Sequence, residues 1–426
     1  MYIYDELRSF EADGGKIKVG IVGAGFMGRG VVEVMESAPG MEVVAISDID
    51  IDRAAACYQS IDFKNYSEIK NADEALKIDL SDRRVICSDF RILPEIEQLD
   101  FIIEATGVPE VGAQTAFFGI MNKKHIGMMN VEADITVGYY LNMLAKKSGV
   151  VYTVCTGDEP AAIKELHDFV KTLGFKVVAC GKGKNNPLDV NATPETLGSR
   201  AKESGLNPRL LTEFVDGSKT MVEMSCAANA TGLYVDKRNM HGAKVNVDQL
   251  SKVFTIKDRG GLLNSEGVID YAIGDVAPGV FLIARHEGRV VNSTLRYLKL
   301  GEGPDHLFYR PYHLTSIEVP VSVAAGFLQK KSVISTSFPP TTEVITIAKK
   351  DLKKGDRIDC LGGFTVYAGI ENSGRARRDT LLPFGLCEGA ALKTDIKKGS
   401  TITYENVELK DNLLHSFRKI QDKMVD

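Results

Sequence analysis

The chain lacks the long apolar runs, the basic excess and the paired cysteines that mark several protein classes. No apolar run approaches the roughly 20 residues that span a bilayer, so no membrane partner is expected. The formal net charge is −5, and nothing in it would neutralise a phosphate backbone, which argues against nucleic acid as a partner. Seven scattered cysteines, at positions 57, 87, 155, 180, 226, 360 and 387, show no zinc or redox spacing.

Those unclustered thiols fit a reducing cytosol. Residues 1–6 (MYIYDE) are acidic and lack the basic and apolar regions of a secretory signal, so we expect a cytoplasmic protein. At 426 residues the chain is too long for one hydrophobic core, and two or three domains are expected.

The sequence GAGFMG at positions 23–28 follows a short apolar run rich in β-branched residues, Lys16–Val22. Apolar residues at helical spacing follow over Arg29–Ser37. This order of strand, turn and helix is the context that the dinucleotide fingerprint requires. The glycines would allow a tight turn, close approach of the pyrophosphate, and packing of helix on strand. We therefore expect a Rossmann fold with cofactor contacts from the following loop residues: Gly23, Gly25, Phe26, Met27 and Gly28.

A second predicted strand, Glu42–Ser47, ends at Asp48. A carboxylate 20 residues after the last glycine can accept hydrogen bonds from ribose hydroxyls, which favours NAD because it would repel a 2′-phosphate. Arg53 is close enough in sequence to soften that repulsion. The alternative is that Asp48 only caps the helix predicted over Asp50–Gln59.

Two further predicted strands end in polar turns. Leu99–Ala105 leads into Thr106 and Gly107, and His125–Met129 leads into Asn130. Ligands of doubly wound sheets lie beyond the carboxyl ends of the strands, so these turns should line the nicotinamide half of the site. Glu132 is expected near the same junction, and the last strand of this block is Val150–Cys155. Residues 1–155 are thus predicted to form the dinucleotide-binding domain.

The next segment, 156–337, is predicted to be an α+β catalytic domain. After a strand at Phe175–Cys180, a glycine-rich loop offers Lys182, Lys184 and Asn185, groups that suit a phosphate or a carboxylate. Surface lysines are also common in such loops.

A second group of candidates in this domain is Asp216, Lys219 and Glu223. A lysine near carboxylates can transfer the proton that reduction of a carbonyl requires. Lys219 and Glu223 are four residues apart on a predicted helix, so an ordinary helical salt bridge is the alternative.

Two more groups could bind an anion or a metal. Arg310 and His313 are three residues apart in a stretch with few other charges, which indicates an anion clamp. Asp158 and Glu159 could bind a divalent ion or cap the helix that follows.

A proline-rich hinge at 338–342 precedes a C-terminal part with an internal near-repeat. Residues 348–358 (AKKDLKKGDRI) return as residues 392–402 (LKTDIKKGSTI), 44 positions later. Two related hairpin-like units predict a small all-β domain over 338–426. The Lys-Lys pairs could bind an anionic ligand or be solvated turn charges.

These motifs together resemble a known group of enzymes. GAGFMG, EATGVP at 104–109 and the Lys219 region are similar to the homoserine-dehydrogenase-like oxidoreductases. More narrowly, GDEP at 157–160, GKGKNNPL at 181–188, DGSKTMVEM at 216–224 and RPYHLTS at 310–316 resemble the DXR-like (DRL) family. The tail resembles a SAF domain, the β-clip module also found on sialic acid synthases.

The resemblance implies a reductoisomerase that converts 1-deoxy-D-xylulose 5-phosphate into 2-C-methyl-D-erythritol 4-phosphate with NADPH, an early step of isoprenoid synthesis. Lys182, Asp216, Lys219 and Glu223 would then be catalytic. Substrate contacts would come from Glu159, Lys184, Asn185, Arg310 and His313. Mg²⁺ or Mn²⁺ could assist, and a homodimer is usual for such enzymes. Asp48 fits poorly, because it favours NAD over NADP.

Family architecture alone does not fix the substrate, since function depends on the site. One alternative is an NAD-dependent dehydrogenase or oxidoisomerase of another branched sugar phosphate or sugar acid. Another is a sensor that binds dinucleotide without turnover, although a non-catalyst has no need of the proton-transfer group around Lys219. A plain homoserine dehydrogenase would need neither the SAF-like tail nor so many anion-binding groups.

Overall fold

The computed structural model describes residues 3–359 and 361–425, so Cys360 lies outside the described residues. The chain forms two compact units. Unit 1 comprises Met1–Ala161, Leu314–Ser337 and Asn412–Asp426, and unit 2 comprises Ala162–His313 and Phe338–Asp411. Within the described ranges, none of the helices combines the length and the apolar character needed to cross a membrane.

Unit 1 is built on a parallel seven-stranded sheet, which confirms the predicted α/β Rossmann architecture. Strand β1 lies between β2 and β5, and the strand order reverses there, so this is the point at which such sheets bind ligands. In spatial order the strands are β3 (Tyr66–Glu68), β4 (Arg84–Cys87), β2 (Met41–Ser47), β1 (Ile17–Val22), β5 (Phe101–Glu104), β6 (His125–Met128) and β7 (Tyr152–Val154).

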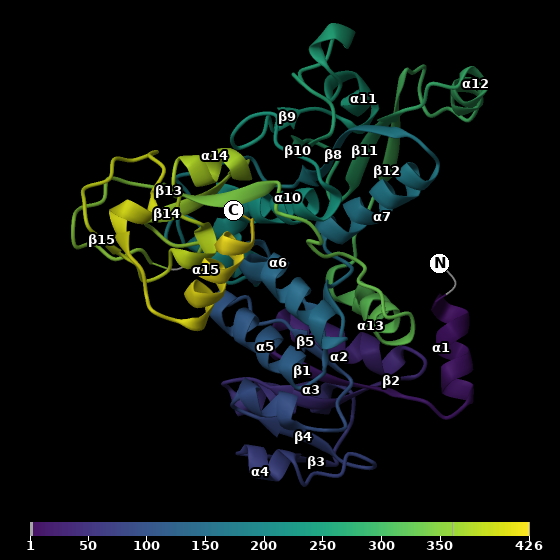
Figure 1. Cartoon of the computed structure of the whole chain (residues 1–426), viewed down its shortest axis with the longest axis vertical. Helices are drawn as coiled ribbons and strands as arrows, with labels where there is room; N and C mark the ends of the chain where they lie inside the picture. Colours follow the sequence, from purple (N-terminus) through teal and green to yellow (C-terminus); the bar gives the residue numbers. More distant parts are fainter. Residues whose placement is uncertain (1–2, 360, 426) are drawn as a thin grey trace. The chain divides into compact units, whose positions relative to one another are not determined.

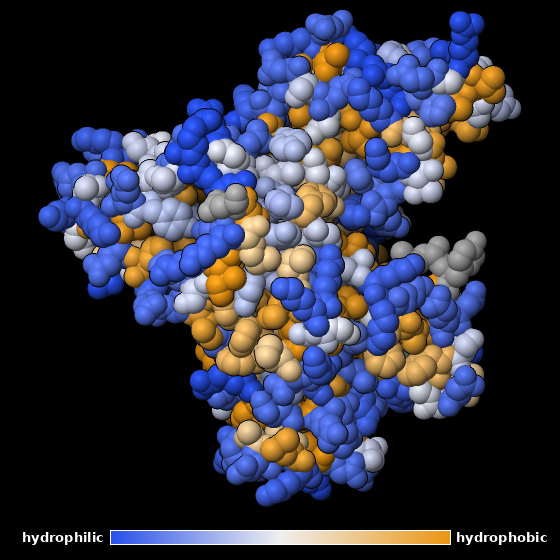
Figure 2. Space-filling view, in the orientation of Figure 1, coloured by the Kyte–Doolittle hydropathy of each residue, from blue (hydrophilic) through white to orange (hydrophobic). Residues whose placement is uncertain are grey.

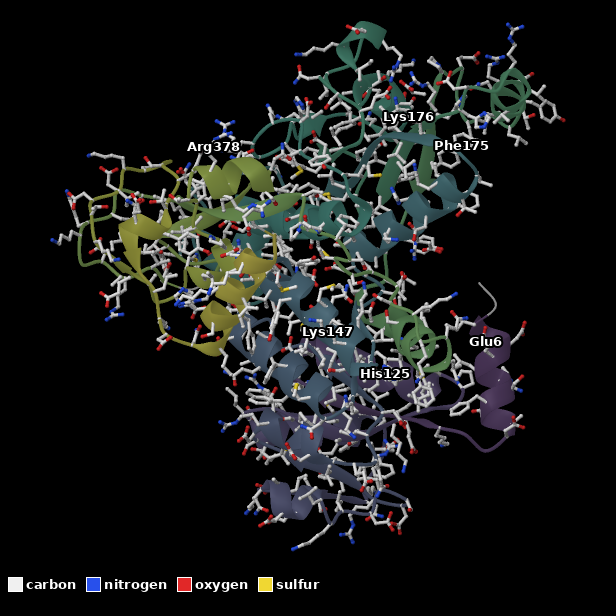
Figure 3. The ribbon with its side chains drawn as sticks, in the orientation of Figure 1. Glu6, His125, Lys147, Phe175, Lys176 and Arg378 are labelled. Carbon is white, nitrogen blue, oxygen red and sulfur yellow. The ribbon has the colours of Figure 1, made fainter. Side chains whose placement is uncertain are left out.

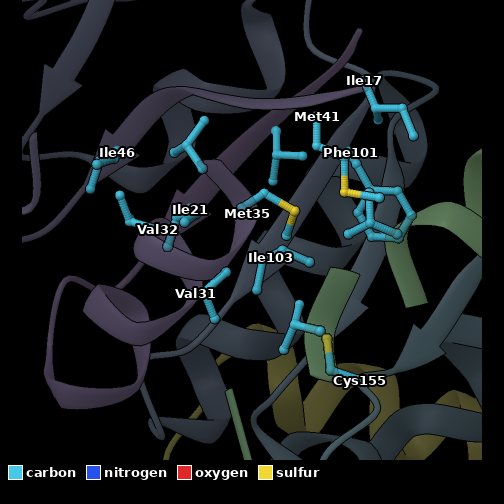
Figure 4. Close-up of a cluster of buried hydrophobic side chains, with 14 of the residues drawn as sticks. Ile17, Ile21, Val31, Val32, Met35, Met41, Ile46, Phe101, Ile103 and Cys155 are labelled. Carbon is cyan, nitrogen blue, oxygen red and sulfur yellow. The ribbon is translucent and has the colours of Figure 1, made fainter. Parts of the chain in front are cut away.

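The core of unit 1 forms where β1 meets the helix that follows the glycine loop. Ile17 and Ile21 of the strand and Val31 and Met35 of the helix are fully buried against one another (Figure 4). The alternation along the strand and the three-to-four spacing along the helix explain why these positions are apolar. The first helices of this unit are α1 (Ile3–Ala12), α2 (Phe26–Ser37), α3 (Ile51–Ser60), α4 (Ala72–Ala75), α5 (Pro109–Met121) and α6 (Val131–Ser148).

Two helices from late in the chain also belong to unit 1. Helix α13 (Val319–Leu328) contributes to the same core, and α15 (Leu413–Val425) packs on α5 and α6 (Figure 1). The Phe417 ring of α15 lies 5.0 Å from that of Phe117 and 5.3 Å from that of Tyr140, measured between centroids. The units therefore do not follow the three contiguous segments 1–155, 156–337 and 338–426, because the buried faces of α13 and α15 pack on the Rossmann domain.

Unit 2 contains a mixed five-stranded sheet. Its order is β12 (Asp305–Arg310), β11 (Val280–Arg285), β8 (Lys176–Lys184), β10 (Val268–Ile273) and β9 (Ala243–Lys244). Figure 3 labels Lys176, where β8 begins. The prediction that this strand ends at Cys180 was wrong, because backbone pairing with β10 and β11 continues to Lys184 and Lys182.

The helices of unit 2 differ in how deeply they are buried. They are α7 (Glu159–Thr172), which joins the two units along the chain, α8 (Gly198–Ser204), α9 (Pro208–Asp216), α10 (Ser218–Thr231), α11 (Leu250–Val253) and α12 (Arg289–Tyr297). Helix α10 is almost wholly buried and packs on β8 and β10. Helix α12 has no buried residue, and its apolar side chains colour the surface there orange in Figure 2.

The remaining elements of unit 2 are the antiparallel pairs β13 (Thr342–Ala348) with β14 (Val366–Asn372) and β15 (Ala391–Leu392) with β16 (Val407–Glu408), and helix α14 (Ser373–Arg378). The two copies of the near-repeat face each other: Leu352 and Ile396 exchange two backbone hydrogen bonds of 2.8 and 2.9 Å. Each copy also pairs a lysine with an aspartate of the other, Lys353 with Asp395 and Lys397 with Asp351. All four side chains are more than half exposed, so these turn charges add little stability.

Candidate functional site

The glycine loop of unit 1 has the geometry that its sequence predicts. Gly23 has φ +100°, and a Cβ there would lie 2.9 Å from the backbone of Ala105. A Cβ on Gly28 would lie 1.9 Å from the carbonyl oxygen of Gly23, so the first helical turn can approach the loop only with glycine at this position. A Cβ on Gly25 would meet no atom within 4 Å, which leaves open space where the pyrophosphate is expected.

The side chains of the same loop point outward. Phe26 is 87% and Met27 37% exposed. Gly25 is the N-cap of α2, so the free backbone N–H groups of the helix begin directly after it.

Asp48 follows β2 and lies half-buried beside the glycine loop. Its two carboxylate oxygens accept hydrogen bonds from the backbone N–H groups of Ala24 (2.7 Å) and Asp50 (2.9 Å). The cap of helix α3 is Asp50 and not Asp48. Arg53 pairs with Asp50 at 3.2 Å, on the exposed side of the same helix.

Glu104, at the end of β5, is a buried acid beside the glycine loop that the sequence analysis did not single out. Its neighbour Ala105 donates its backbone N–H to Val22, the last residue of β1. The Glu104 carboxylate accepts hydrogen bonds from the backbone N–H of Thr106 (2.9 Å) and from the Thr106 hydroxyl. The turn then continues to Gly107, at φ +71° with open space around it. Glu104 thus fixes the turn at the point where the strand order reverses.

Asn130 lies next to this acid, at the N-cap of α6. Its side-chain oxygen accepts from the N–H of Ala133 (3.1 Å). Among the described residues, Glu104 Oε2 and Asn130 Nδ2 are buried without a hydrogen-bond partner. A Cβ on Gly112 of α5 would lie within 3.2 Å of both, so the small residue leaves them room.

Burial raises the pKa of Glu104 to about 7, and the negative charge of Glu132 adds to the effect. The hydrogen bonds from Thr106 act in the opposite direction and lower this pKa, as does the nearby Asn130 amide. A charged residue at the end of the apolar run Phe-Ile-Ile-Glu was the available sequence signal for this site.

The second group of candidates lies in unit 2, where β8 faces α10. Lys182 and Lys184 are two apart on one strand, so both side chains point to the same face of the sheet. Gly183 between them faces the other way, and a Cβ there would lie 2.1 Å from the backbone nitrogen of Ala277. The Lys-Gly-Lys pattern is thus a strand with one crowded face and one cationic face.

Glu223 of α10 lies between two of these lysines. It forms a buried ion pair with Lys182, and its other oxygen is 4.0 Å from Lys219 Nζ, one turn earlier on the helix. The side chain of Glu223 is 3% exposed and that of Lys182 9%, so little water reaches the pair. Lys219 and Glu223 are thus at ion-pair distance on one face of the helix, and Lys182 joins them from the sheet.

Lys184 lies near the same group, and its ammonium donates to the carbonyl oxygen of Phe214. Burial and the positive charge of Lys182 together lower its pKa to about 8, although Asp216 and Glu223 act in the opposite direction. Asn185, the next residue, is exposed beyond the end of the strand.

Asp216 has a different partner from the one that the sequence suggested. It is the last residue of α9, and its fully buried carboxylate pairs with Lys349 Nζ at 2.8 Å. Its other oxygen accepts from the backbone N–H of Ser218 (2.9 Å). Like Glu104, Lys349 is a buried charged residue that was not predicted from the sequence, because it stands in the first copy of the repeat among several other lysines.

Arg310 lies in the same sheet as the lysines. Val280 pairs with Arg310 on one side and with Lys182 on the other, so the three form a row across the sheet. Residues paired directly in this way place their side chains on one face. The Arg310 guanidinium pairs with Glu165 at 2.9 Å. His313 donates from Nδ1 to the carbonyl oxygen of Pro278 (2.8 Å).

Glu159 is buried at the beginning of α7, in unit 1. The loop before it is held tightly: Thr315 donates its backbone N–H to Gly157 (2.7 Å). A Cβ on Gly157, whose φ is +109°, would overlap the Thr315 carbonyl oxygen. The conformation of this loop therefore depends on that glycine.

Two family models match the chain. One, described as "Oxidoreductase DRL, catalytic domain", matches residues 157–319, and one described as "Oxidoreductase family, NAD-binding Rossmann fold" (GFO_IDH_MocA) matches residues 17–88. None of the curated proteins matches the chain. Together the two matches support an NAD-binding oxidoreductase. The prediction of an oxidoreductase that uses a dinucleotide cofactor is thereby confirmed.

Several solved structures are similar in part. Scyllo-inositol dehydrogenase from Lactobacillus casei is 12% identical, with a TM-score of 0.42, covering 75% of this chain and 90% of its own. Myo-inositol dehydrogenase from Corynebacterium glutamicum is 11% identical (TM-score 0.36; 63% and 72% covered). An NAD-binding oxidoreductase from Klebsiella pneumoniae is 12% identical (TM-score 0.34; 71% and 68% covered). At these identities the structures assign no substrate to this chain.

Two glycine substitutions should separate cofactor binding from folding. Gly25→Ala adds a methyl group in open space, so we expect an unchanged melting temperature but NADH binding weakened by about tenfold, or about 1.4 kcal/mol. Gly28→Ala places its Cβ against Gly23, so we expect a lower melting temperature as well as weaker binding. Calorimetry and fluorescence titration with NADH measure both. Unchanged NADH affinity in Gly25→Ala would contradict the assignment of the loop.

Glu104 should make stability depend on pH in a defined direction. Its folded-state pKa is about 7 against an ordinary value of 4.5, so between these values the folded chain keeps a proton that the unfolded chain has lost. This contribution to the free energy of unfolding is fully present below the lower value and is lost as the pH rises through the higher one. As the pH rises over that range, we expect the free energy of unfolding of Glu104→Gln to fall less than that of the wild type.

The measurement is the melting temperature of Glu104→Gln minus that of the wild type, from about pH 5 to about pH 8, where we expect a rise of a few degrees. Glu97→Gln, which changes an exposed acid of the same unit, is the matched control and should show a flat difference. A flat difference for Glu104→Gln as well would rule out proton uptake at this site.

Proposed function

We propose that the chain is an NAD(P)H-dependent reductoisomerase that converts 1-deoxy-D-xylulose 5-phosphate into 2-C-methyl-D-erythritol 4-phosphate. The observation that carries the proposal is the group formed by Lys182, Lys184, Lys219 and Glu223. It lies inside the segment that matches the DRL catalytic domain, residues 157–319.

The charges of this group suit an anionic substrate. Lys182, Lys184 and Lys219 supply three positive charges near Glu223, in a region with little access to water. Buried positive charge is costly unless anions lie nearby, so a phosphate or carboxylate of the substrate would find a favourable site. Arg310 reaches the same face of the sheet and is a further candidate for this contact.

The same residues can manage the protons of the reaction. The proposed reaction moves a carbon–carbon bond and then reduces the resulting aldehyde, consuming one hydride from the reduced dinucleotide and one proton from the protein or solvent. Glu223 can accept a proton from a substrate hydroxyl during the rearrangement. Lys184, with a pKa of about 8, can supply one to the alkoxide that forms on reduction.

Asp48 favours a second candidate function. A carboxylate held at the end of β2, with Arg53 paired to Asp50, would repel a 2′-phosphate and suits NADH. The second candidate is therefore an NAD-dependent dehydrogenase or oxidoisomerase of another branched sugar phosphate or sugar acid. A sensor without turnover has no use for the buried proton-transfer group and is the weaker alternative.

Further features belong to the same proposal. The reciprocal pairing of the two repeats around Leu352 and Ile396 supports a SAF-like domain in the C-terminal part. A requirement for Mg²⁺ or Mn²⁺, a homodimeric assembly and a cytoplasmic location complete the proposal.

The decisive experiment offers the purified protein 1-deoxy-D-xylulose 5-phosphate with NADH or NADPH, with and without Mg²⁺ or Mn²⁺. We expect dinucleotide oxidation and the methylerythritol product, with NADH used at least as well as NADPH. A preference for NADPH above about a hundredfold, about 2.7 kcal/mol, would contradict the role of Asp48. Absence of oxidation with either dinucleotide would exclude the reductoisomerase and favour the second candidate.

Lys219→Ala should separate turnover from dinucleotide binding. Lys219 belongs to the proton-transfer group of unit 2, whereas the glycine loop belongs to unit 1, so we expect turnover to be lost while NADH affinity stays within a few-fold. Lys202→Ala, which changes an exposed lysine of the same unit, is the matched control. Turnover in Lys219→Ala near the rate of Lys202→Ala would remove Lys219 from the mechanism.

A further inference from the structure

Lys349 is a lysine buried at the end of β13, with 2% of its side chain exposed. Its ammonium donates to three oxygens: Asp216 Oδ2 (2.8 Å), the carbonyl of Ala192 (2.8 Å) and the carbonyl of Gly363 (3.0 Å). An ammonium has three N–H donors, so every one is used. Lys349 is therefore shielded from solvent, whereas its neighbour Lys350 is exposed.

The partner of Lys349 is attached directly to the start of helix α10. Asp216 holds Lys349 with one oxygen and the backbone N–H of Ser218 with the other, at 2.8 and 2.9 Å. Gly217 makes the turn between the two helices with φ +88°. Lys219 follows in the first turn of α10, and Glu223 one turn later.

The β13–β14 hairpin continues to hold α10 along its length. The Ser218 hydroxyl accepts the backbone N–H of Ala368 in β14 (2.9 Å), and the Ser225 hydroxyl lies 2.9 Å from that of Thr342 in β13. Near the end of the helix, the side-chain oxygen of Asn229 accepts the backbone N–H of Thr342 (2.9 Å). Helix α10 therefore has the hairpin on one side and Lys182 of β8 on the other.

We propose that Lys349 is a positioning residue, which fixes the first turn of α10 through Asp216 and so sets where Lys219 and Glu223 stand relative to Lys182. The proposal rests on the proposed function for the catalytic meaning of those residues. On this proposal the C-terminal segment 338–411 helps to build the site of unit 2. Asp216 connects that segment to the start of helix α10.

Lys349→Met tests the proposal, because methionine keeps the length of the side chain and removes the ammonium. We expect amide hydrogen exchange in residues 218–223 to become about tenfold faster or more, since the buried Asp216 loses its counter-charge. Exchange in β1, β5 and β6 of unit 1 should not change. Lys350→Met, one residue away and exposed, should exchange like the wild type.

Turnover provides the second readout. We expect kcat of Lys349→Met to fall about tenfold or more while the Kd for NADH stays within about twofold, a split that general destabilisation would not produce. The basic limb of the pH–rate profile should also shift to higher pH, because the negative charge of Asp216, no longer neutralised by Lys349, raises the pKa of Lys184. Asp216→Asn should move it in the opposite direction.

If Lys349→Met does not fold, the double variant Lys349→Met/Asp216→Asn leaves no lone buried charge and takes its place in both measurements. Unchanged exchange in residues 218–223 would overturn the proposal, whatever the substrate proves to be. Faster exchange would support it even if 1-deoxy-D-xylulose 5-phosphate is not turned over by the wild type, a result that would count against the proposed function alone.

Discussion

A carboxylate buried as deeply as that of Glu223 is costly unless positive charge lies directly beside it. In unit 2 this requirement joins two elements that are distant in sequence, because Lys182 comes from strand β8 and Glu223 from helix α10. The same requirement acts again at the start of the helix, where Asp216 is buried with Lys349. The position of α10, and with it the chemistry available on its surface, depends on these two ion pairs together with its hydrogen bonds to β13 and β14.

The glycine loop of unit 1 depends on the close approach of backbone segments. Gly23 and Gly28 allow β1, the turn after β5 and helix α2 to meet without side chains between them. A buried acid at this junction, Glu104, holds the neighbouring turn by accepting the hydrogen bonds of Thr106. The loop is thus shaped before any ligand arrives, which reduces the entropic cost of binding.

Much of the local structure could be predicted, because it depends on residues close in sequence. The strand, glycine loop and helix over residues 17–37 need only alternation, a turn and helical spacing. The end of β8 was predicted wrongly because its last residues, Gly-Lys-Gly-Lys, have a low β propensity, and only pairing with β10 and β11 makes them a strand. The sequence could not show either that α13 and α15 belong to unit 1, since an apolar helix face can pack on any hydrophobic core of suitable shape.

The sequence by itself determined that the chain holds a dinucleotide on a Rossmann domain, because the glycine fingerprint specifies backbone conformation locally. The sequence motifs also indicated Lys182, Lys219 and Glu223 as candidate catalytic residues. Only the tertiary structure decided which charges are partners. Lys219 is only three residues from Asp216, yet Asp216 pairs with Lys349. A buried carboxylate needs a cation beside it, and the long-range packing of the chain decides which cation that is.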